Sequence, residues 1–129
     1  MKRYVMVNKP KFNIFKNITY ALDGMVETFR SEKSFRIQFA STTVVAFALF
    51  FVPLSLKTKM ILYLSTWLIL IAEAFNSAIE RVVDMVTKEY NELAKQAKDI
   101  GAFGVLLAFI LTLMIWIVTL YSEFEGVIK

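Results

Sequence analysis

With 129 residues, 57% of them hydrophobic, and a mean hydropathy of +0.57, the chain is too apolar for an ordinary soluble domain and indicates a single-domain integral membrane protein over residues 1–129. It contains no cysteine and no histidine, which excludes disulfides and thiolate or imidazole metal sites and leaves oxygen ligands, the kind that Mg²⁺ prefers. The net charge of +4 is modest, and its basic residues crowd the N-terminal third, which we interpret as membrane orientation and not nucleic-acid binding.

The first part of the chain is too polar to span a bilayer. Residues 1–11 form a basic tail without apolar periodicity, and we expect no cleavable signal sequence after it. Over about 13–31, apolar side chains recur three and four residues apart, which predicts an amphipathic helix that lies in the membrane interface or packs on other helices. A charged elbow follows at residues 30–36. Its acid, Glu32, is either a solvated carboxylate or a metal ligand.

Three apolar segments are each long enough to cross the hydrocarbon core, which is about 30 Å thick at a rise of 1.5 Å per residue. They are residues 37–56, 60–79 and 100–122, the second of them continuing as a helix to residue 86. A short break at Pro53 predicts that the first two run antiparallel. The polar connection 87–99 precedes the third.

Small residues indicate how these spans pack, and basic residues indicate which of their ends are cytoplasmic. Small residues recur on one stripe at the start of the third span, at Ala94, Ala97, Gly101, Gly104 and Ala108. Such a stripe allows close helix packing in lipid, although small residues are also common in membrane helices generally. Basic residues concentrate before residue 37 and in residues 80–99, which predicts that the N-terminus and the polar connection are cytoplasmic.

One polar stripe runs out of the second span along a single helix face. At about 100° per residue, Glu73, Asn76, Glu80 and Asp84 fall within about 80° of one another. An ionisable group inside an apolar span is a functional candidate because hydrocarbon penalises it. The alternative is a soluble amphipathic helix with these acids in water.

The predicted topology gathers acids, an amide and a lysine at the cytoplasmic surface, since Glu32, Lys98 and Asp99 join this stripe there. Such a set suits Mg²⁺ and a phosphate-bearing ligand. Glu73 would lie about 10 Å deeper than Glu80, where a general base would meet a lipid headgroup hydroxyl. The sequence has no Walker loop and no protein-kinase glycine loop.

The same residues carry a resemblance to a known family. The run EAFNSAIERVVD from Glu73 to Asp84, followed by Ala97-Lys98-Asp99, resembles the signature E-x-x-N-[ST]-A-I-E-x-V-V-D and A-K-D of the small bacterial membrane diacylglycerol kinases. Residues 32–36 (EKSFR) resemble the E-x-x-F-R element of that family. The resemblance implies a homotrimer of three-span subunits with an N-terminal surface helix, which transfers the γ-phosphate of Mg-ATP to diacylglycerol at the inner membrane to give phosphatidic acid.

Matching positions in that family imply roles for individual residues. Glu73 would be the catalytic base and would contact the lipid, and Glu32 and Glu80 would hold Mg²⁺ and, with it, ATP. The other residues implied at the nucleotide are Tyr20, Glu89, Tyr90, Asn91, Lys98 and Asp99. Those implied along the lipid path are Ser34, Phe35, Arg36 and Trp116, and Asn76 and Asp84 would support the site. Two departures stand out: Asn13 replaces an arginine that many members carry, and Ile37-Gln38 replaces a Gln-Glu pair.

Two other functions compete with this one. Undecaprenol kinases share the Asn-x-Ala-Ile-Glu core, but the connection KEYNEL (residues 88–93) and a Phe-Arg pair with no histidine nearby favour the diacylglycerol branch. A non-enzymatic membrane assembly or ion-path protein is the second alternative. It would need polar residues at matching depth in more than one span, whereas Glu73 is the one acid inside the apolar segments.

Overall fold

The computed structural model describes residues 13–128, with side chains to residue 125, so the basic tail expected over residues 1–11 lies outside the described residues. The described part is all-helical. Its elements are α1 (Ile14–Ser31), α2 (Lys33–Phe51), α3 (Leu56–Val86) and α4 (Glu92–Ile128). The last three are long and apolar enough to cross a membrane. The structure thus confirms an all-α fold with three candidate spans.

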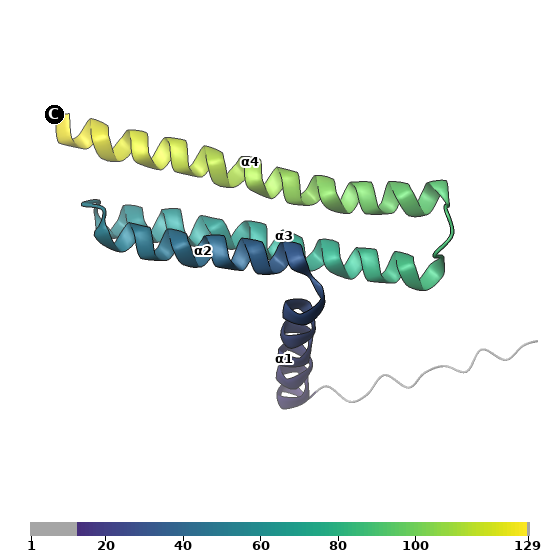
Figure 1. Ribbon diagram of the computed structural model, residues 1–129. Helices are drawn as coiled ribbons and strands as arrows, with labels where there is room; N and C mark the ends of the chain where they lie inside the picture. The colour runs from purple at the N-terminus through teal and green to yellow at the C-terminus, as the bar shows by residue number, and fades with distance from the viewer. Residues whose placement is uncertain (1–12, 129) are drawn as a thin grey trace, which may run out of the picture.

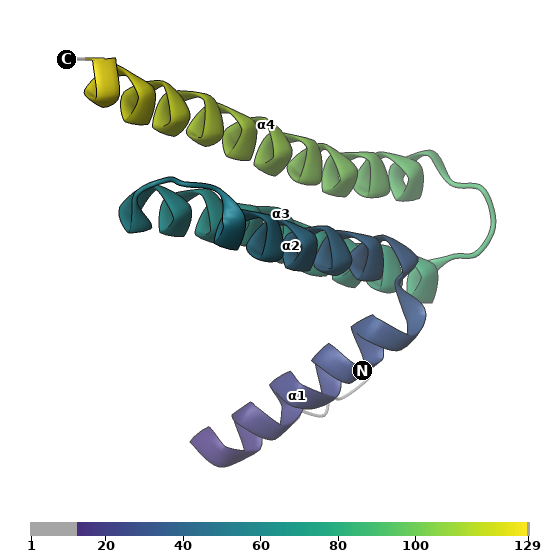
Figure 2. The same cartoon turned by 60° about the vertical axis from the view of Figure 1, so that its left-hand side comes forward.

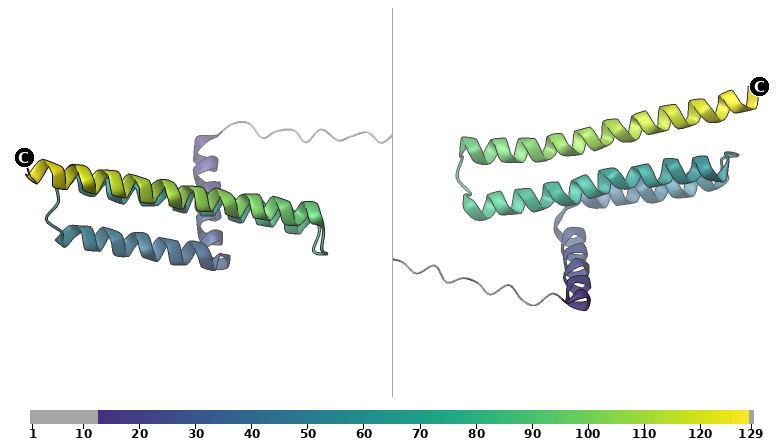
Figure 3. Two further views of the ribbon diagram at one scale, coloured as in Figure 1. Left: turned by 90° about the horizontal axis from the view of Figure 1, so that it is seen from above. Right: turned by 180° about the vertical axis from the view of Figure 1, so that it is seen from behind.

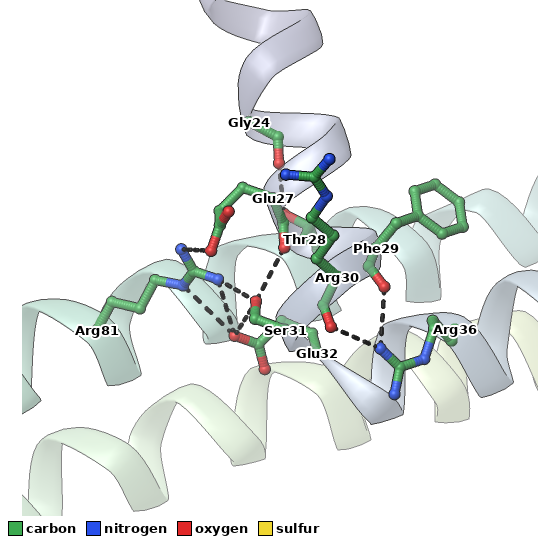
Figure 4. A network of polar contacts seen from close by, with 9 residues as sticks. All are labelled: Gly24, Glu27, Thr28, Phe29, Arg30, Ser31, Glu32, Arg36 and Arg81. Atoms are coloured by element: carbon green, nitrogen blue, oxygen red, sulfur yellow. Dashed lines mark hydrogen bonds and ion pairs between the residues drawn. The ribbon is translucent and has the colours of Figure 1, made fainter.

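Helices α2, α3 and α4 run side by side, whereas α1 lies crosswise to them (Figures 1, 2 and 3). Helix α3 packs most extensively against α4 and also contacts α2, so it is the central element of the three. The short connections 52–55 and 87–91 make successive long helices antiparallel. Helix α1 joins the start of α2 at the elbow, directly beside α3 (Figure 4).

Polar side chains fix where three of the helices begin. Asn13 and Asn91 each accept hydrogen bonds from the backbone N–H groups two and three residues further on, and Ser55 accepts one from Thr58 N at 3.3 Å. Each bond satisfies a donor that the first helical turn would leave unpaired. Asn13 is therefore the N-cap of α1.

The Asn91 cap also explains why α4 begins before the apolar segment. The sequence places a polar connection over residues 87–99, but only 87–91 lie between α3 and α4. The residues that follow Asn91 are polar yet good helix formers, such as Glu, Lys, Gln and Ala. The apolar span therefore begins after these polar residues, but the helix itself already starts at the first of them, Glu92.

Small side chains fill the contacts between the long helices. The buried polar residues are Thr42, Thr58, Ser65, Thr66, Ser77 and Thr112, and the buried apolar ones are Leu49, Leu62, Ile69 and Leu70. Several hydroxyls bond helix carbonyls, as Thr112 Oγ1 does with Ser65 O on α3 at 3.0 Å. Large apolar side chains mostly point outward, which is the arrangement expected where lipid is the solvent and close packing holds helices together.

Candidate active site

The polar stripe of α3 begins with three side chains that turn toward the elbow and α4. Glu73, Asn76 and Glu80 are each half-buried. Asn76 Nδ2 donates a hydrogen bond to Glu80 Oε1 at 3.0 Å, which holds that carboxylate on the stripe. The charges of Glu80 and Glu32 both act on the Glu73 carboxylate. Glu73 and Glu80 thus share the polar face of α3, and the charge of Glu32 acts on Glu73 from the elbow.

Helix α4 comes very close to this stripe at Gly101. That glycine is buried, and a Cβ added to it would collide with Asn76 Oδ1. The same Asn76 oxygen is buried and has no hydrogen-bond partner among the described residues. In contrast, a Cβ added to Gly104 would meet nothing within 4 Å. The small-residue stripe of α4 thus contacts α3 closely at Gly101, whereas at Gly104 it faces open space.

Glu32 reaches the stripe because the chain bends between α1 and α2. Its backbone is extended (φ −99°, ψ 106°), and its N–H donates to Thr28 O at 2.9 Å, which ends α1. Its Oε1 accepts hydrogen bonds from Ser31 Oγ at 3.3 Å and from the guanidinium of Arg81 on α3 (Figure 4). The predicted metal ligand of the elbow is thereby tied to the helix that carries the other acids.

Arg36 and Phe35 hold the elbow from the side of α2. Arg36 Nη1 donates to the carbonyl oxygens of Phe29 and Arg30, each at 2.9 Å, and so caps the C-terminus of α1 (Figure 4). The ring of Phe35 meets that of Phe29 edge to face at 5.2 Å. In this structure both residues shape the bend, and Ser34 beside them is exposed. Their roles along a lipid path stay predictions.

A second group of predicted residues meets where α3 and α4 extend beyond the apolar segments. A pocket of about 260 Å³ lies between the end of α3, the connection and the start of α4. Six predicted site residues line it: Asp84, Glu89, Tyr90, Asn91, Lys98 and Asp99. Tyr20 does not line this pocket; it lies on α1 and is largely exposed.

Ion pairs and a tyrosine hydrogen bond organise this pocket. Lys98 Nζ donates to Asp84 Oδ1 at 2.7 Å, and Lys95 pairs with Asp99 at 2.8 Å. Tyr90 OH donates to the carboxylate of Glu92 at 2.7 Å, and this hydrogen bond is the main cause that raises the pKa of the phenol above its usual value. Both ion pairs are well exposed, so they exchange readily for another anion.

The sequence model of the prokaryotic diacylglycerol kinase family matches residues 19–120. The chain belongs to this family. Diacylglycerol kinase of Escherichia coli (strain K12) is 33% identical over 111 residues, which cover 86% of this chain and 91% of that relative. Undecaprenol kinase of Bacillus subtilis (strain 168) is 35% identical over 101 residues, covering 78% and 82%. Diacylglycerol kinase of Synechocystis sp. (strain PCC 6803) is 36% identical over 104 residues, covering 80% and 59%.

Membership of the prokaryotic diacylglycerol kinase family makes this chain a membrane-bound lipid kinase. The three candidate spans agree with that conclusion.

A cleft of about 330 Å³ between α2, α3 and α4 contains Gln38 and Trp116. Trp116 Nε1 donates to Leu62 O at 3.1 Å and to Ser65 Oγ at 3.0 Å. The residue predicted on the lipid path thus also joins α4 to α3.

A magnesium ion that arrives with phosphates would need only one or two carboxylates of the candidate site. Within residues 13–125, no group of three or more acidic side chains converges closely enough to hold a metal ion by itself. Mg²⁺ is usually held by one or two carboxylates together with substrate phosphates and water. Glu32 and Glu80, both within electrostatic range of Glu73, are of the right number and chemistry for this kind of site.

Sequence reasoning missed Arg81, which contacts both the end of α1 and the elbow. A lone basic residue directly after the stripe acid Glu80 was the available signal. It also missed Glu123, whose carboxylate accepts hydrogen bonds from Ser55 and Thr58 at the opposite end of α3. These contacts join residues at least 49 positions apart in the chain, so spacing alone could not reveal them.

Proposed function

We propose that this chain transfers the γ-phosphate of Mg-ATP to the hydroxyl of diacylglycerol and produces phosphatidic acid at the cytoplasmic surface of the inner membrane. The observation that carries the proposal is the acid stripe of α3, in which Glu73 lies in the apolar part of the helix and Glu80 two turns further toward its polar end. The name of the Escherichia coli relative supports diacylglycerol as the acceptor. The resemblance described above supports assembly as a homotrimer, and the distribution of basic residues supports a cytoplasmic N-terminus.

The proposed roles follow from where each carboxylate lies. Glu73, half-buried in the apolar part of α3, would take the proton of the acceptor hydroxyl as general base. Glu80 and Glu32 hold Mg²⁺, which neutralises charge on the phosphates when it is bound. Asn76 keeps Glu80 oriented through the 3.0 Å hydrogen bond. One helix face thus separates proton removal from cation binding.

The pocket between α3 and α4 is the proposed place of the nucleotide. Lys98 supplies a cation for phosphate once it leaves Asp84, and the exposed ring of Tyr90 offers a face for a base. Glu89, Asn91 and Asp99, which also line the pocket, complete the set there. Tyr20, which the resemblance also implies at the nucleotide, lies on α1 outside this pocket. Ser34, Phe35, Arg36 and Trp116 are the residues proposed along the lipid path.

Undecaprenol is the second candidate acceptor. The Bacillus subtilis relative named undecaprenol kinase is as similar to this chain as the diacylglycerol kinases are. Both acceptors present a hydroxyl at the membrane surface, so the same base and cation would serve either one. The KEYNEL connection at residues 88–93 favours diacylglycerol.

A lipid-panel assay tests the function. The full chain is reconstituted in phosphatidylcholine vesicles that contain either diacylglycerol or undecaprenol, and γ-labelled ATP is added with Mg²⁺. We expect label in phosphatidic acid and little in undecaprenyl phosphate. Label mainly in undecaprenyl phosphate would select the second acceptor. No ATP-dependent labelling of any lipid would contradict the proposed function and favour the assembly or ion-path alternative.

A further inference from the structure

One arginine joins the elbow to the acid-bearing helix. Arg81 on α3 approaches Glu32 Oε1 with Nη2 at 3.2 Å and Nε at 3.4 Å. Its Nη1 lies 3.5 Å from Glu27 Oε1 on α1, and its Nη2 also donates to Ser31 Oγ (Figure 4). The guanidinium is therefore shared between two carboxylates, one on α1 and one at the elbow.

The oxygen that Arg81 contacts belongs to a proposed cation ligand. Glu32 Oε1 accepts from both guanidinium nitrogens and from Ser31 Oγ. With three donors on Oε1, a divalent cation would have to use Oε2 or displace the guanidinium, and at either oxygen its charge and that of Arg81 repel each other at short range. Arg81 and the cation therefore compete for the same carboxylate.

The competition is weak enough to be reversible. The Arg81 side chain is 42% exposed and that of Glu32 23% exposed, and ion pairs of such exposure shift an equilibrium by only about 1.5- to fivefold. Arg81 also has a second partner in place, because Glu27 contacts a different nitrogen of the same guanidinium. When Glu32 turns away, the arginine keeps a carboxylate and stays at the elbow.

Building on the proposed function, we propose that Arg81 is a positioning residue that holds Glu32 while no nucleotide is bound and yields it to the divalent cation. It keeps the carboxylate beside α3 and at the same time raises the cation concentration needed to fill the site. Arg81 thus sets the cation concentration at which the site fills, and Glu27 is the carboxylate that Arg81 keeps once Glu32 is released. A purely structural arginine would have the opposite effect, since its loss would misplace Glu32 and weaken cation binding.

Mn²⁺ binding tests this directly. The full chain in phosphatidylcholine vesicles is titrated with Mn²⁺ and a non-hydrolysable ATP analogue, and the Mn²⁺ retained by the sedimented vesicles is read by electron paramagnetic resonance against matched vesicles without protein. We expect Arg81→Met to bind Mn²⁺ about two- to fivefold more tightly than the parent. Arg81→Gln, which keeps a polar side chain, serves as a second variant if the first does not fold, as judged by circular dichroism.

Two further variants complete the design. In the background of Glu32→Gln, Arg81→Met should give no gain, because the carboxylate under competition is absent. Glu27→Gln is the matched control: it removes the other partner of Arg81 without freeing Glu32, so Mn²⁺ binding should not tighten and should weaken by at most about twofold.

The outcomes separate this inference from the proposed function. Unchanged or weaker Mn²⁺ binding by folded Arg81 variants, in a parent that binds Mn²⁺ and phosphorylates lipid, would overturn the role of Arg81 alone. A gain that persists in the Glu32→Gln background would also overturn it, since competition for Glu32 would not be the cause. A parent that binds no Mn²⁺ with the nucleotide analogue would overturn both proposals.

Discussion

The two ends of α3 carry polar clusters of opposite character. At the turn end, defined by Ser55, Thr58 and Glu123, the carboxylate accepts hydrogen bonds from Ser55 N at 2.7 Å, Ser55 Oγ at 2.9 Å and Thr58 Oγ1 at 2.5 Å. At the acid end, defined by Glu32, Glu73, Asn76 and Glu80, the charges of Glu80 and Glu32 act on Glu73, and Asn76 Oδ1 is buried with no hydrogen-bond partner among the described residues.

This difference separates stability from function. At the turn end, a side chain from α4 accepts hydrogen bonds from the N-cap residue of α3 and from a hydroxyl in its first turn, so it joins the two helices. The acid end combines carboxylates of like charge with an unpaired amide oxygen that lies against Gly101. Both cost stability, which is expected where the groups serve another purpose. Substitutions at the acid end should therefore change chemistry, and those at the turn end should change stability.

The largest expected effect is that of Glu73→Gln. Removal of a positioned general base typically lowers the rate by about 10²- to 10⁴-fold. Nucleotide binding should stay close to that of the parent, because Glu80 lies two helical turns away on α3 and is untouched. Lipid phosphorylation and nucleotide binding are measured on the same vesicles. Near-normal turnover would remove Glu73 from its proposed role.

Glu80→Gln should separate cation binding from folding. The Gln oxygen can still accept the hydrogen bond from Asn76 Nδ2, so circular dichroism and thermal stability should match those of the parent. Loss of a group that merely supports a metal ligand typically costs about 10- to 100-fold in affinity, so loss of the ligand should cost at least as much. Calorimetric titration with Mg-ATP gives the value. Unchanged affinity would contradict the metal role.

Gly101→Ala should lower activity about tenfold by moving Asn76. The new Cβ would displace the Asn76 amide and with it the hydrogen bond that orients Glu80; a misplaced catalytic group can cost up to about 10²-fold. Gly104→Ala is the matched control, since it has space and gains helix propensity. Activity is compared at equal folded protein. Equal activities for the two variants would mean that the Gly101 contact is unimportant.

Gly101→Leu, with a larger side chain, should also weaken the assembly.

The smallest expected effect is at the turn end. Glu123→Gln keeps the shape of the side chain but replaces a charged acceptor, so the hydrogen bonds to Ser55 and Thr58 weaken. We expect the midpoint of thermal unfolding to fall by a few degrees, while the rate per folded molecule stays unchanged. A normal midpoint with reduced activity would reverse the assignment of the two ends.

The helices and the stripe were accessible from the sequence because they depend on local periodicity. Apolar length predicts the spans, and residues at steps of three and four predict that Glu73, Asn76 and Glu80 share one face. Helix ends were less accessible: a cap such as Asn91 acts through backbone geometry that hydropathy does not record. Charged residues after it suggested a connection although they continue α4.

Contacts between distant segments were the part that the sequence could not supply. The link between Arg81 and Glu32 depends on how the elbow places α1 across α3. Likewise, the contact of Gly101 with Asn76 depends on the rotation of α4 about its own axis. Small residues at regular spacing indicated a close approach, yet they could not distinguish Gly101 from Gly104.

The unbroken course of α3 makes it a molecular ruler. Glu73 and Asp84 belong to one helix without a kink-forming proline or a loop, so eleven residues fix their separation along the axis at about 16 Å. An insertion between them would rotate one carboxylate away from the other by about 100° per residue. In the proposed reaction, α3 thus fixes the positions along its axis at which the acceptor hydroxyl and the nucleotide meet the protein. A thicker or thinner bilayer would move the lipid relative to Glu73 without changing the distances within the site.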